Sequence, residues 1–259
     1  MNSHLGSDDL ARARGLLEDA ARIFVLTGAG ISAESGVPTF RGEEGLWRSR
    51  RPQDLATPQA FRRDPRLVWE WYGWRRELVS RCEPNAGHSA LARLALDRSA
   101  RIVTQNVDGL HEVAARTEGN GSDWEPASPL ELHGSLFRVR CTECVYHGRH
   151  RGPIDATDTT SLPTCPECGA LLRPDIVWFG EGLDPDVLTT AVSLAREADL
   201  CVVVGTSAVV QPAASLPRVT REAGGSIIEV NPQVTPLTSL AEVALPGSAG
   251  LVLPVLVGR

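Results

Sequence analysis

The sequence contains no lysine. All 26 basic residues of the 259-residue chain are arginine, which we attribute to the base composition of the genome rather than to function. The chain also lacks any run of about 18 apolar residues, so we expect no membrane-spanning helix and no membrane partner. The first residues, MNSHLGSDDL, lack the basic start and the apolar middle of a signal peptide. We therefore expect a cytoplasmic protein.

An excess of positive charge is also missing. The formal net charge of −6 does not fit the broad basic surface that general nucleic-acid binding requires, so we expect no nucleic-acid partner. Two short basic stretches occur, RSRR at 48–51 and RR at 62–63. We interpret both as solvated surface, and a local basic strip is the alternative.

Cysteine is scarce, because six cysteines in a chain of this length are too few for a disulfide framework. Four of them form two C-x2-C pairs, Cys141 with Cys144 and Cys165 with Cys168, separated by twenty residues. This is the spacing of a zinc ribbon, and four thiolates fill the tetrahedral coordination of zinc. We therefore predict one structural Zn²⁺ rather than a catalytic one. His147 and His150 lie between the pairs and could compete as ligands.

Short apolar runs alternate with amphipathic helical patterns along most of the chain. The runs predict strands at 23–28, 101–106, 200–207 and 226–231, and the amphipathic patterns predict helices at 8–22, 86–96, 184–198 and 213–224. Such alternation indicates an α/β fold with an open, Rossmann-like parallel sheet and helices on both faces. In such sheets, ligands bind at the carboxyl ends of the strands.

Two segments interrupt this alternation. Residues 37–85 are rich in Trp, Arg and Pro and predict helices and loops, whereas residues 134–174 contain the paired cysteines. We therefore predict a Rossmann-like domain of residues 1–36, 86–133 and 175–259, a helical insert at 37–85, and a small zinc-ribbon domain at 134–174.

The glycine-rich stretch TGAGISAESG, at 27–36, directly follows the first predicted strand. Gly28, Gly30 and Ala33 fit the pattern G-x-G-x-x-G/A, in which glycines permit a tight turn and bring the backbone close to a pyrophosphate. An ordinary dehydrogenase would continue with a helix and a second strand that ends in an acid. Here GVPTFRGEEGLW follows, which indicates a longer loop that covers a ligand.

Polar residues follow the second predicted strand in TQNVDGLH, at 104–111. Gln105, Asn106 and Asp108 would lie at the ligand-binding edge of the sheet, where they could orient an amide or a ribose. The alternative is that Asn106 or Asp108 caps the following helix. In LELHGSLF, at 130–137, His133 is either a structural histidine or a general base, since its unperturbed pKa is about 6.5.

These motifs, followed by RPDIVWFGE, GTSAVVQPA and EVNPQ in that order, resemble the sirtuin family of NAD-dependent protein lysine deacylases. The resemblance extends over nearly the whole chain. It implies that NAD and an acyl-lysine protein or peptide meet in the cleft between the large and the small domain. It also implies a monomer.

The resemblance further implies the roles of individual residues. Those expected to contact NAD are Gly28, Ala29, Gly30, Ile31, Ser32, Glu34, Ser35, Phe40, Arg41, Trp47, Gln105, Asn106, Val107, Asp108, Gly205, Thr206, Ser207, Asn231, Pro232, Gln233 and Ala249. Those expected to pair with the peptide as a strand are Val177, Trp178, Phe179, Gly180 and Glu181. The implied catalytic residues are His133, Asn106 and Asp108.

The implied reaction begins when the acyl oxygen attacks the anomeric carbon of the nicotinamide ribose and nicotinamide leaves. His133 then acts as general base on the ribose hydroxyls. The acyl group migrates to ADP-ribose, and free lysine is released.

The stretch EWYGWRREL, at 70–78, bears on the acyl group. Tyr72 and Arg75 are three residues apart and share one face of a helix. They match the Tyr-x-x-Arg pair of the sirtuin branch that removes malonyl, succinyl and glutaryl groups, and the resemblance is to its bacterial members. Ala56 matches an alanine of that branch. A guanidinium can bind a carboxylate through two hydrogen bonds. We expect removal of these acidic acyl groups and also of acetyl.

Several alternatives remain open. If Tyr72 packs against its tryptophan neighbours and Arg75 is solvated, the protein is a plain deacetylase. A protein ADP-ribosyltransferase or an NAD hydrolase would use the same cleft. A non-catalytic NAD-binding zinc module would not need His133, Asn106 and Asp108, and all three are present. Release of nicotinamide only when an acyl-lysine peptide is added would separate the deacylase from these alternatives.

Overall fold

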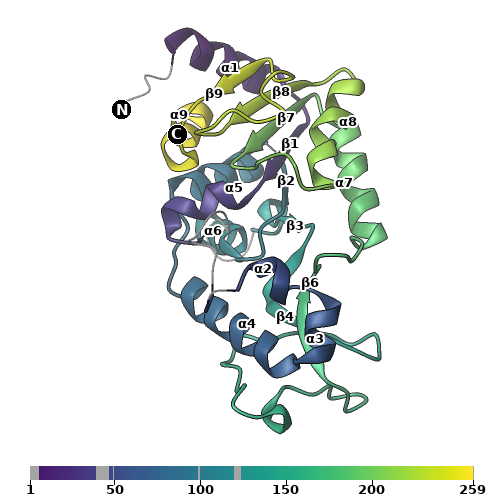
Figure 1. Cartoon of the computed structure of the whole chain (residues 1–259). Coiled ribbons are helices and arrows are strands. Elements are labelled where there is room, and N and C mark those ends of the chain that lie inside the picture. The colour runs from purple at the N-terminus through teal and green to yellow at the C-terminus, as the bar shows by residue number, and fades with distance from the viewer. Residues whose placement is uncertain (1–5, 39–46, 49, 99, 120–123, 259) are drawn as a thin grey trace.

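A computed structural model describes residues 6–38, 47–48, 50–98, 100–119 and 124–258 of the chain (Figure 1). The elements in chain order are α1 (Ser7–Asp19), β1 (Ile23–Thr27), η1 (Ala29–Ser35), α2 (Pro52–Leu55), α3 (Pro58–Arg63), α4 (Pro65–Val79), α5 (Ala86–Arg98), β2 (Arg101–Thr104), α6 (Leu110–Glu118), η3 (Glu125–Ala127), β3 (Leu130–Glu131), β4 (Gly134–Cys141), β5 (His147–Arg149), η4 (Thr159–Ser161), β6 (Leu172–Ile176), α7 (Pro185–Glu197), β7 (Leu200–Val204), η5 (Ala213–Ser215), α8 (Leu216–Glu222), β8 (Ser226–Val230), β9 (Val243–Leu245) and α9 (Ala249–Val257).

A parallel sheet with the strand order β3-β2-β1-β7-β8-β9 forms the upper lobe in Figure 1. Val25 of β1 lies between Ile102 of β2 and Val202 of β7. The chain therefore extends the sheet in one direction from β1 and in the other from β7. In open α/β sheets, ligands bind at the carboxyl ends of the strands where the strand order reverses in this way.

Helices cover both faces of this sheet, as predicted. On β1, Ile23 and Val25 pack with α1, α5 and α9, whereas Phe24 and Leu26 pack with α7 and α8. All five residues of the strand are buried. Burial on both faces explains why the sequence shows continuous apolar runs rather than alternation of apolar and polar residues.

The structure divides one predicted helix in two, and it contains further helices, among them η1 and α9, that we did not predict. The segment after β1 forms the 3-10 helix η1, which ends at Gly36 with a φ of +86°. The helix predicted at 213–224 is divided into η5 and α8. Pro217 lies in the first turn of α8, where its missing N–H is not needed. Among the described residues, no helix is both long and apolar enough to cross a bilayer.

The lower lobe combines α2, α3 and α4 with a three-stranded antiparallel sheet of order β5-β4-β6 (Figure 1). The helical insert and the cysteine-bearing segment share one core, in which Trp69 and Trp71 pack with Leu136 and Leu172. The indole Nε1 of Trp69 donates to the carbonyl of Leu172 at 2.9 Å. The two segments that interrupt the α/β pattern are thus parts of one packed unit.

Candidate active site

Two glycine-bearing loops touch each other at the carboxyl edge of the parallel sheet. The N–H of Gly30 donates to the carbonyl of Gly205 at 2.7 Å. A Cβ on Gly30 would lie 2.6 Å from that oxygen, and a Cβ on Gly205, whose φ is +59°, would lie 2.4 Å from the nitrogen of Ile31. Contact between the loops therefore requires both glycines. The sequence had suggested a tight turn and close approach to a pyrophosphate as the reasons for the first glycine-rich loop.

A buried polar cluster connects η1 to the loop after β2. The hydroxyl of Ser32 donates to Asp108 Oδ2 at 2.8 Å, and the amide of Asn106 donates to Ser32 Oγ at 3.1 Å. Asp108 Oδ1 also accepts from the N–H of Leu110, at the start of α6. Asp108 thus supports the helix and faces the cluster at the same time. Burial raises the pKa of Asp108, and its hydrogen bonds and the charge of Arg75 oppose this rise.

A second set of hydrogen bonds ties together the ends of β2, β7 and β8. The amide of Gln105 donates to Thr206 Oγ1 at 3.0 Å, and the amide of Asn231 donates to the carbonyl of Thr206 at 2.6 Å. These residues are far apart in the sequence and lie at the same edge, because parallel strands all end there. The predicted site residues after each of these strands are therefore brought together.

His133 lies between the two lobes, immediately before β4. Its Nδ1 is 2.9 Å from the carbonyl oxygen of Gln105. Since a carbonyl only accepts, Nδ1 carries the proton in the neutral ring and Nε2 can take one. Burial lowers the pKa of His133, and the bond to Gln105 opposes this. The ring is therefore neutral at pH 7 and suited to act as a base.

The glycine after His133 controls the direction of the chain. Gly134 has a φ of +80°, and a Cβ there would lie 2.0 Å from the carbonyl oxygen of Asp175 on β6. Only glycine fits both the backbone conformation and the close contact. The motif LELHGSLF thus places His133 at the point where the chain passes from the upper to the lower lobe.

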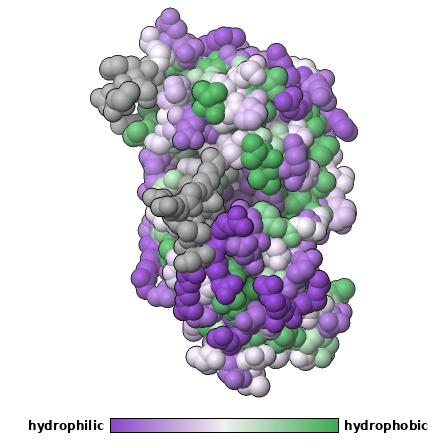
Figure 2. All heavy atoms as spheres, in the orientation of Figure 1, coloured by the Kyte–Doolittle hydropathy of each residue, from purple (hydrophilic) through white to green (hydrophobic). Residues whose placement is uncertain are grey.

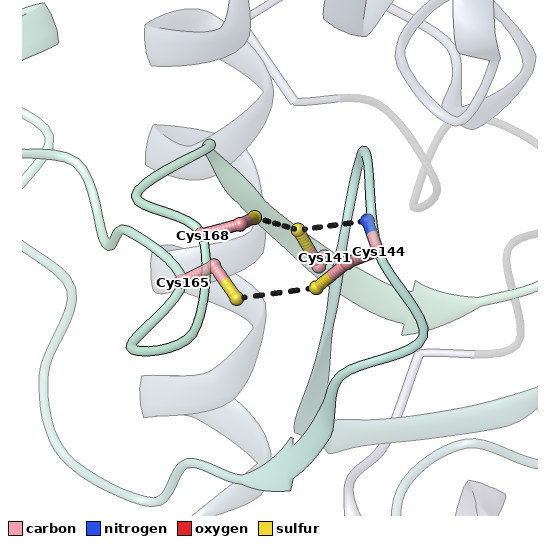
Figure 3. A group of neighbouring side chains, drawn as sticks. All are labelled: Cys141, Cys144, Cys165 and Cys168. Carbon is pink, nitrogen blue, oxygen red and sulfur yellow. Dashed lines mark hydrogen bonds between the residues drawn. The ribbon is translucent and has the colours of Figure 1, made fainter.

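The side chains of the four paired cysteines point toward one another (Figure 3). Their sulfur atoms all lie within 4.8 Å of one another, with Cys141 to Cys168 at 3.4 Å and Cys144 to Cys165 at 3.6 Å. Zn–S bonds of about 2.3 Å in a tetrahedron place sulfur atoms about 3.8 Å apart, so the group fits Zn²⁺. Four thiolates leave no open position, as expected for a structural metal.

Neither histidine between the cysteine pairs belongs to this group. His147 lies 3.6 Å from a carboxylate oxygen of Asp175, and His150 contacts Arg76. The backbone N–H groups of Glu143 and Cys144 point to the sulfur of Cys141, as in a zinc knuckle. The four cysteines therefore form the candidate zinc site, and His147 and His150 take no part in it.

The segment 177–181, which we expected to pair with a peptide as a strand, forms a turn at Phe179 and Gly180, where Gly180 has a φ of +86°. The N–H of Val177 donates to the carbonyl of His133 at 3.0 Å, and that of Phe179 to the carbonyl of Ala56 at 2.9 Å. The turn is closed by the N–H of Glu181, which donates to the carbonyl of Trp178 at 2.9 Å, so the segment is not a continuous strand in this structure. The bond from Val177 holds it next to His133, and its pairing with a peptide stays a prediction.

The side chain of Glu181 stabilises this turn. It accepts from the N–H of Trp178 at 2.9 Å and from both terminal nitrogens of Arg173, at 2.6 and 2.9 Å. The guanidinium of Arg173 also stacks on Trp178, 3.3 Å from the ring centre. Trp178 is thus buried as a structural anchor of the turn.

The face of α4 that carries Tyr72 and Arg75 is turned inward, with the residues 1% and 9% exposed. The Tyr72 hydroxyl accepts from Trp178 Nε1 at 2.9 Å. Arg75 lies over the rings of Trp71 and Tyr72 at 5.0 and 5.5 Å. Burial lowers the pKa of Arg75, whereas the charges of Tyr72 and Asp108 raise it. The solvated Arg75 of the alternative interpretation is therefore not what the structure contains.

Comparison with known proteins adds to this geometry. The profile described as "Sir2 family" matches residues 28–212. The chain belongs to the Sir2 family, the sirtuins. It is 48% identical to the NAD-dependent protein deacylase of Pyrococcus furiosus, with 96% of each chain covered. It is 49% identical to NAD-dependent protein deacylase 1 of Archaeoglobus fulgidus, with 93% of this chain and 94% of the relative covered.

Solved structures of Sir2 proteins share the fold. The crystal structure of a Sir2 homologue in complex with NAD superposes with a TM-score of 0.86 and 47% identity, covering 95% of this chain and 92% of that one. A Sir2 complex with a p53 peptide and NAD⁺ gives a TM-score of 0.78 and 32% identity, covering 92% and 93%. The sirtuin resemblance and the Rossmann-like fold class are confirmed.

Some of the residues predicted to contact NAD have other partners in this Sir2 protein. Glu34 accepts from the hydroxyl of Ser248 at 2.8 Å and from the N–H of Gly250 at 2.7 Å, at the start of α9. Trp47 is buried. Phe40 and Arg41 lie outside the described residues. Contact with NAD stays a prediction for the whole set.

Sequence reasoning missed three residues that support this Sir2 site. Asn85 donates to the carbonyl of Ile31 at 2.7 Å and so holds η1. His88 lies 3.3 Å from Ser32 Oγ, and the rings of His88 and His111 are 4.9 Å apart. Burial lowers the pKa of His88 to about 4, so this ring is neutral at pH 7. The available signal was Asn85 itself, a helix-capping residue type directly before α5.

Proposed function

We infer that this Sir2 enzyme, an NAD-dependent protein deacylase, prefers lysines that carry an acidic acyl group, such as succinyl, malonyl or glutaryl, and also removes acetyl. The observation that supports this is the pair formed by Tyr72 and Arg75, both buried on the inward face of α4. A guanidinium binds a carboxylate through two parallel charge-assisted hydrogen bonds. Succinyl, malonyl and glutaryl groups each end in a carboxylate, whereas an acetyl group does not.

The position of the pair fits the reaction. Tyr72 is bonded to Trp178, and Trp178 belongs to the turn next to His133. Arg75 is close enough to Asp108 for each charge to shift the pKa of the other. An acyl group bound by Tyr72 and Arg75 would therefore extend from the polar cluster around Asp108 into the lower lobe.

The chain supplies binding, orientation and proton transfer. NAD supplies the ribose that accepts the acyl group. Gln105, Asn106 and Asp108 would orient the nicotinamide and its ribose at the sheet edge. His133, whose Nε2 is the free acceptor, would take a proton from a ribose hydroxyl. Zinc, held by the distant cysteine group, keeps the lower lobe folded.

The proposal is tested by kcat/KM on one peptide that carries either succinyl-lysine or acetyl-lysine. In the wild type we expect succinyl to be preferred. Arg75→Met should reduce the succinyl-to-acetyl ratio about ten- to a hundredfold, because a hydrogen bond to a charged group contributes about 1.5–3 kcal/mol. Activity on the acetyl peptide should change much less, since an uncharged chain forms no ion pair with Arg75.

Arg76→Met is the matched control. Arg76 is the adjacent buried arginine, and it donates to the carbonyl of His150 and, at 3.3 Å, to that of Gly152. Its loss should lower stability without changing the acyl ratio. If the wild type prefers acetyl and Arg75→Met affects both peptides equally, the acidic-acyl proposal is wrong. If nicotinamide release does not depend on an acyl-lysine peptide, the deacylase proposal is wrong.

A further inference from the structure

The segment around α2 and α3 is basic in a chain whose net charge is negative. Residues 48–66 contain six arginines and two aspartates, although the whole chain has a net charge of −6. The arginines are Arg48, Arg50, Arg51, Arg62, Arg63 and Arg66. Figure 2 shows hydrophilic side chains gathered over this part of the surface. Glu43 and Glu44 come shortly before it in the sequence and lie outside the described residues.

Half of these arginines form no ion pair within the described part of the chain, although Arg50 is near enough to Asp54 for its charge to lower the pKa of that carboxyl. Arg51 pairs with Asp54 at 3.4 Å, and Glu70 pairs with Arg48 at 2.7 Å and with Arg66 at 3.9 Å. Asp64 is used to cap α4. No ion pair with a described acid involves Arg50, Arg62 or Arg63, and all three are exposed.

This basic surface adjoins the turn at 177–181. The carbonyl of Ala56, between α2 and α3, accepts from the N–H of Phe179, and Phe61 of α3 lies 5.4 Å from Trp178 between ring centres. Arg62 and Arg63 directly follow Phe61. The one acid of the turn, Glu181, is more than balanced by Arg173 and Arg140.

We propose that α2 and α3 form a docking surface for acidic residues that flank the acylated lysine of a substrate protein. The inference rests on the proposed deacylase function and adds the charge of the preferred substrate sequence to it. An extended peptide advances about 3.3 Å per residue, and a six-residue helix is about 9 Å long. A few residues on one side of the lysine would thus pass within a Debye length, about 8–10 Å, of these arginines. The next acids along the chain, Asp184 and Asp186, belong to the start of α7, so we expect the preference on one flank only.

The test uses three acetyl-lysine peptides of one sequence, with glutamates before the lysine, glutamates after it, or glutamines in both places. Acetyl is chosen because an acidic acyl group would itself respond to Arg75. At low ionic strength, one of the two acidic peptides should exceed the neutral peptide about three- to tenfold in kcat/KM. High salt should remove the advantage. Calorimetric binding of the same peptides should show the same order.

Variants separate this surface from the general charge of the protein. Arg62→Gln with Arg63→Gln should bring the acidic-to-neutral ratio close to one, and the corresponding pair of Glu substitutions should reverse it. The control pair is Arg12→Glu with Arg218→Glu, on α1 and α8 at the other end of the molecule, where both arginines are exposed (Figure 1). This control pair changes the net charge as much as the Arg62→Glu, Arg63→Glu pair does, and it should retain the wild-type acidic-to-neutral ratio.

Two results would overturn the proposal: equal kcat/KM for the three peptides in the wild type, or an equal loss of the preference in the control pair. Failure of the deacylase proposal would look different. The wild type would then release no lysine from any peptide, and the calorimetric preference alone would decide whether the docking surface exists.

Discussion

The hydrogen bond between His133 Nδ1 and the carbonyl of Gln105 leaves Nε2 of the neutral ring as the acceptor. Burial, the larger cause, lowers the pKa of His133 below its ordinary value of 6.5. A base works in its deprotonated form, so kcat/KM should rise with pH through the pKa of this group, and the midpoint of the acidic limb should lie below 6.5. His133→Ala should reduce kcat at least about a hundredfold. A pH–rate profile of both forms checks this.

His147→Ala is the control, because the side chain of His147 is more than half exposed and lies 3.6 Å from Asp175 in the lower lobe. It should leave the midpoint unchanged. If His133→Ala unfolds the protein, the structural interpretation of this histidine is supported instead. An acidic limb centred above 6.5 would contradict the effect of burial.

At the residue scale, the sequence was most informative where a residue type has few other uses. The paired cysteines were predicted because their spacing is rarely found without zinc, whereas the catalytic role of His133 follows from the family resemblance and stays a prediction. His88 and His111 were not predicted, because their burial depends on how α5 packs against α6. Glu34 was assigned to NAD through its motif, whereas its carboxylate caps α9, more than 200 residues away in the chain. Local patterns do not reveal partners at that separation.

At the scale of elements, the contact between the η1 loop and the loop after β7 should limit both stability and cofactor binding. Gly30→Ala would place a methyl group 2.6 Å from the Gly205 carbonyl, so the two loops would have to separate. We expect a loss of about 1–3 kcal/mol in the free energy of unfolding, as for overpacking, together with weaker NAD binding. Urea denaturation and calorimetric titration with NAD measure the two effects.

Gly15→Ala in α1 is the matched control, because nothing lies within 4 Å of the added Cβ. It should stabilise the protein by up to about 1 kcal/mol through helix propensity and leave NAD binding unchanged. Equal effects of the two substitutions would mean that the loop contact affects neither stability nor NAD binding.

The strands that bear these loops, β1 and β7, were predictable from continuous apolar runs. Strands β3 and β9 were not, because two and three residues are too short to form a pattern.

At the scale of the whole molecule, the sequence indicated three parts, and the structure packs two of them around one core. The helical insert and the zinc segment each show too few apolar residues in a regular period to reveal a shared interior. Trp69 and Trp71 on α4 meet Leu136 and Leu172 only after the chain has folded. The lower lobe therefore positions Tyr72 and Arg75 as well as the turn at 177–181.

This shared core gives zinc a long-range effect. Removing the ion should destabilise the β4–β6 sheet, then the packing of α4, and finally the position of Tyr72 and Trp178. Because structural zinc contributes directly to folding, we expect the unfolding temperature to fall by about 10 °C or more and activity to be lost. Cys168→Ser should have the same effect, whereas Cys82→Ser, outside the cysteine group, should not. Zinc content, circular dichroism on heating and kcat/KM measure the outcome, and re-addition of zinc should restore all three. Full activity in a protein completely stripped of zinc would show that the lower lobe folds without it.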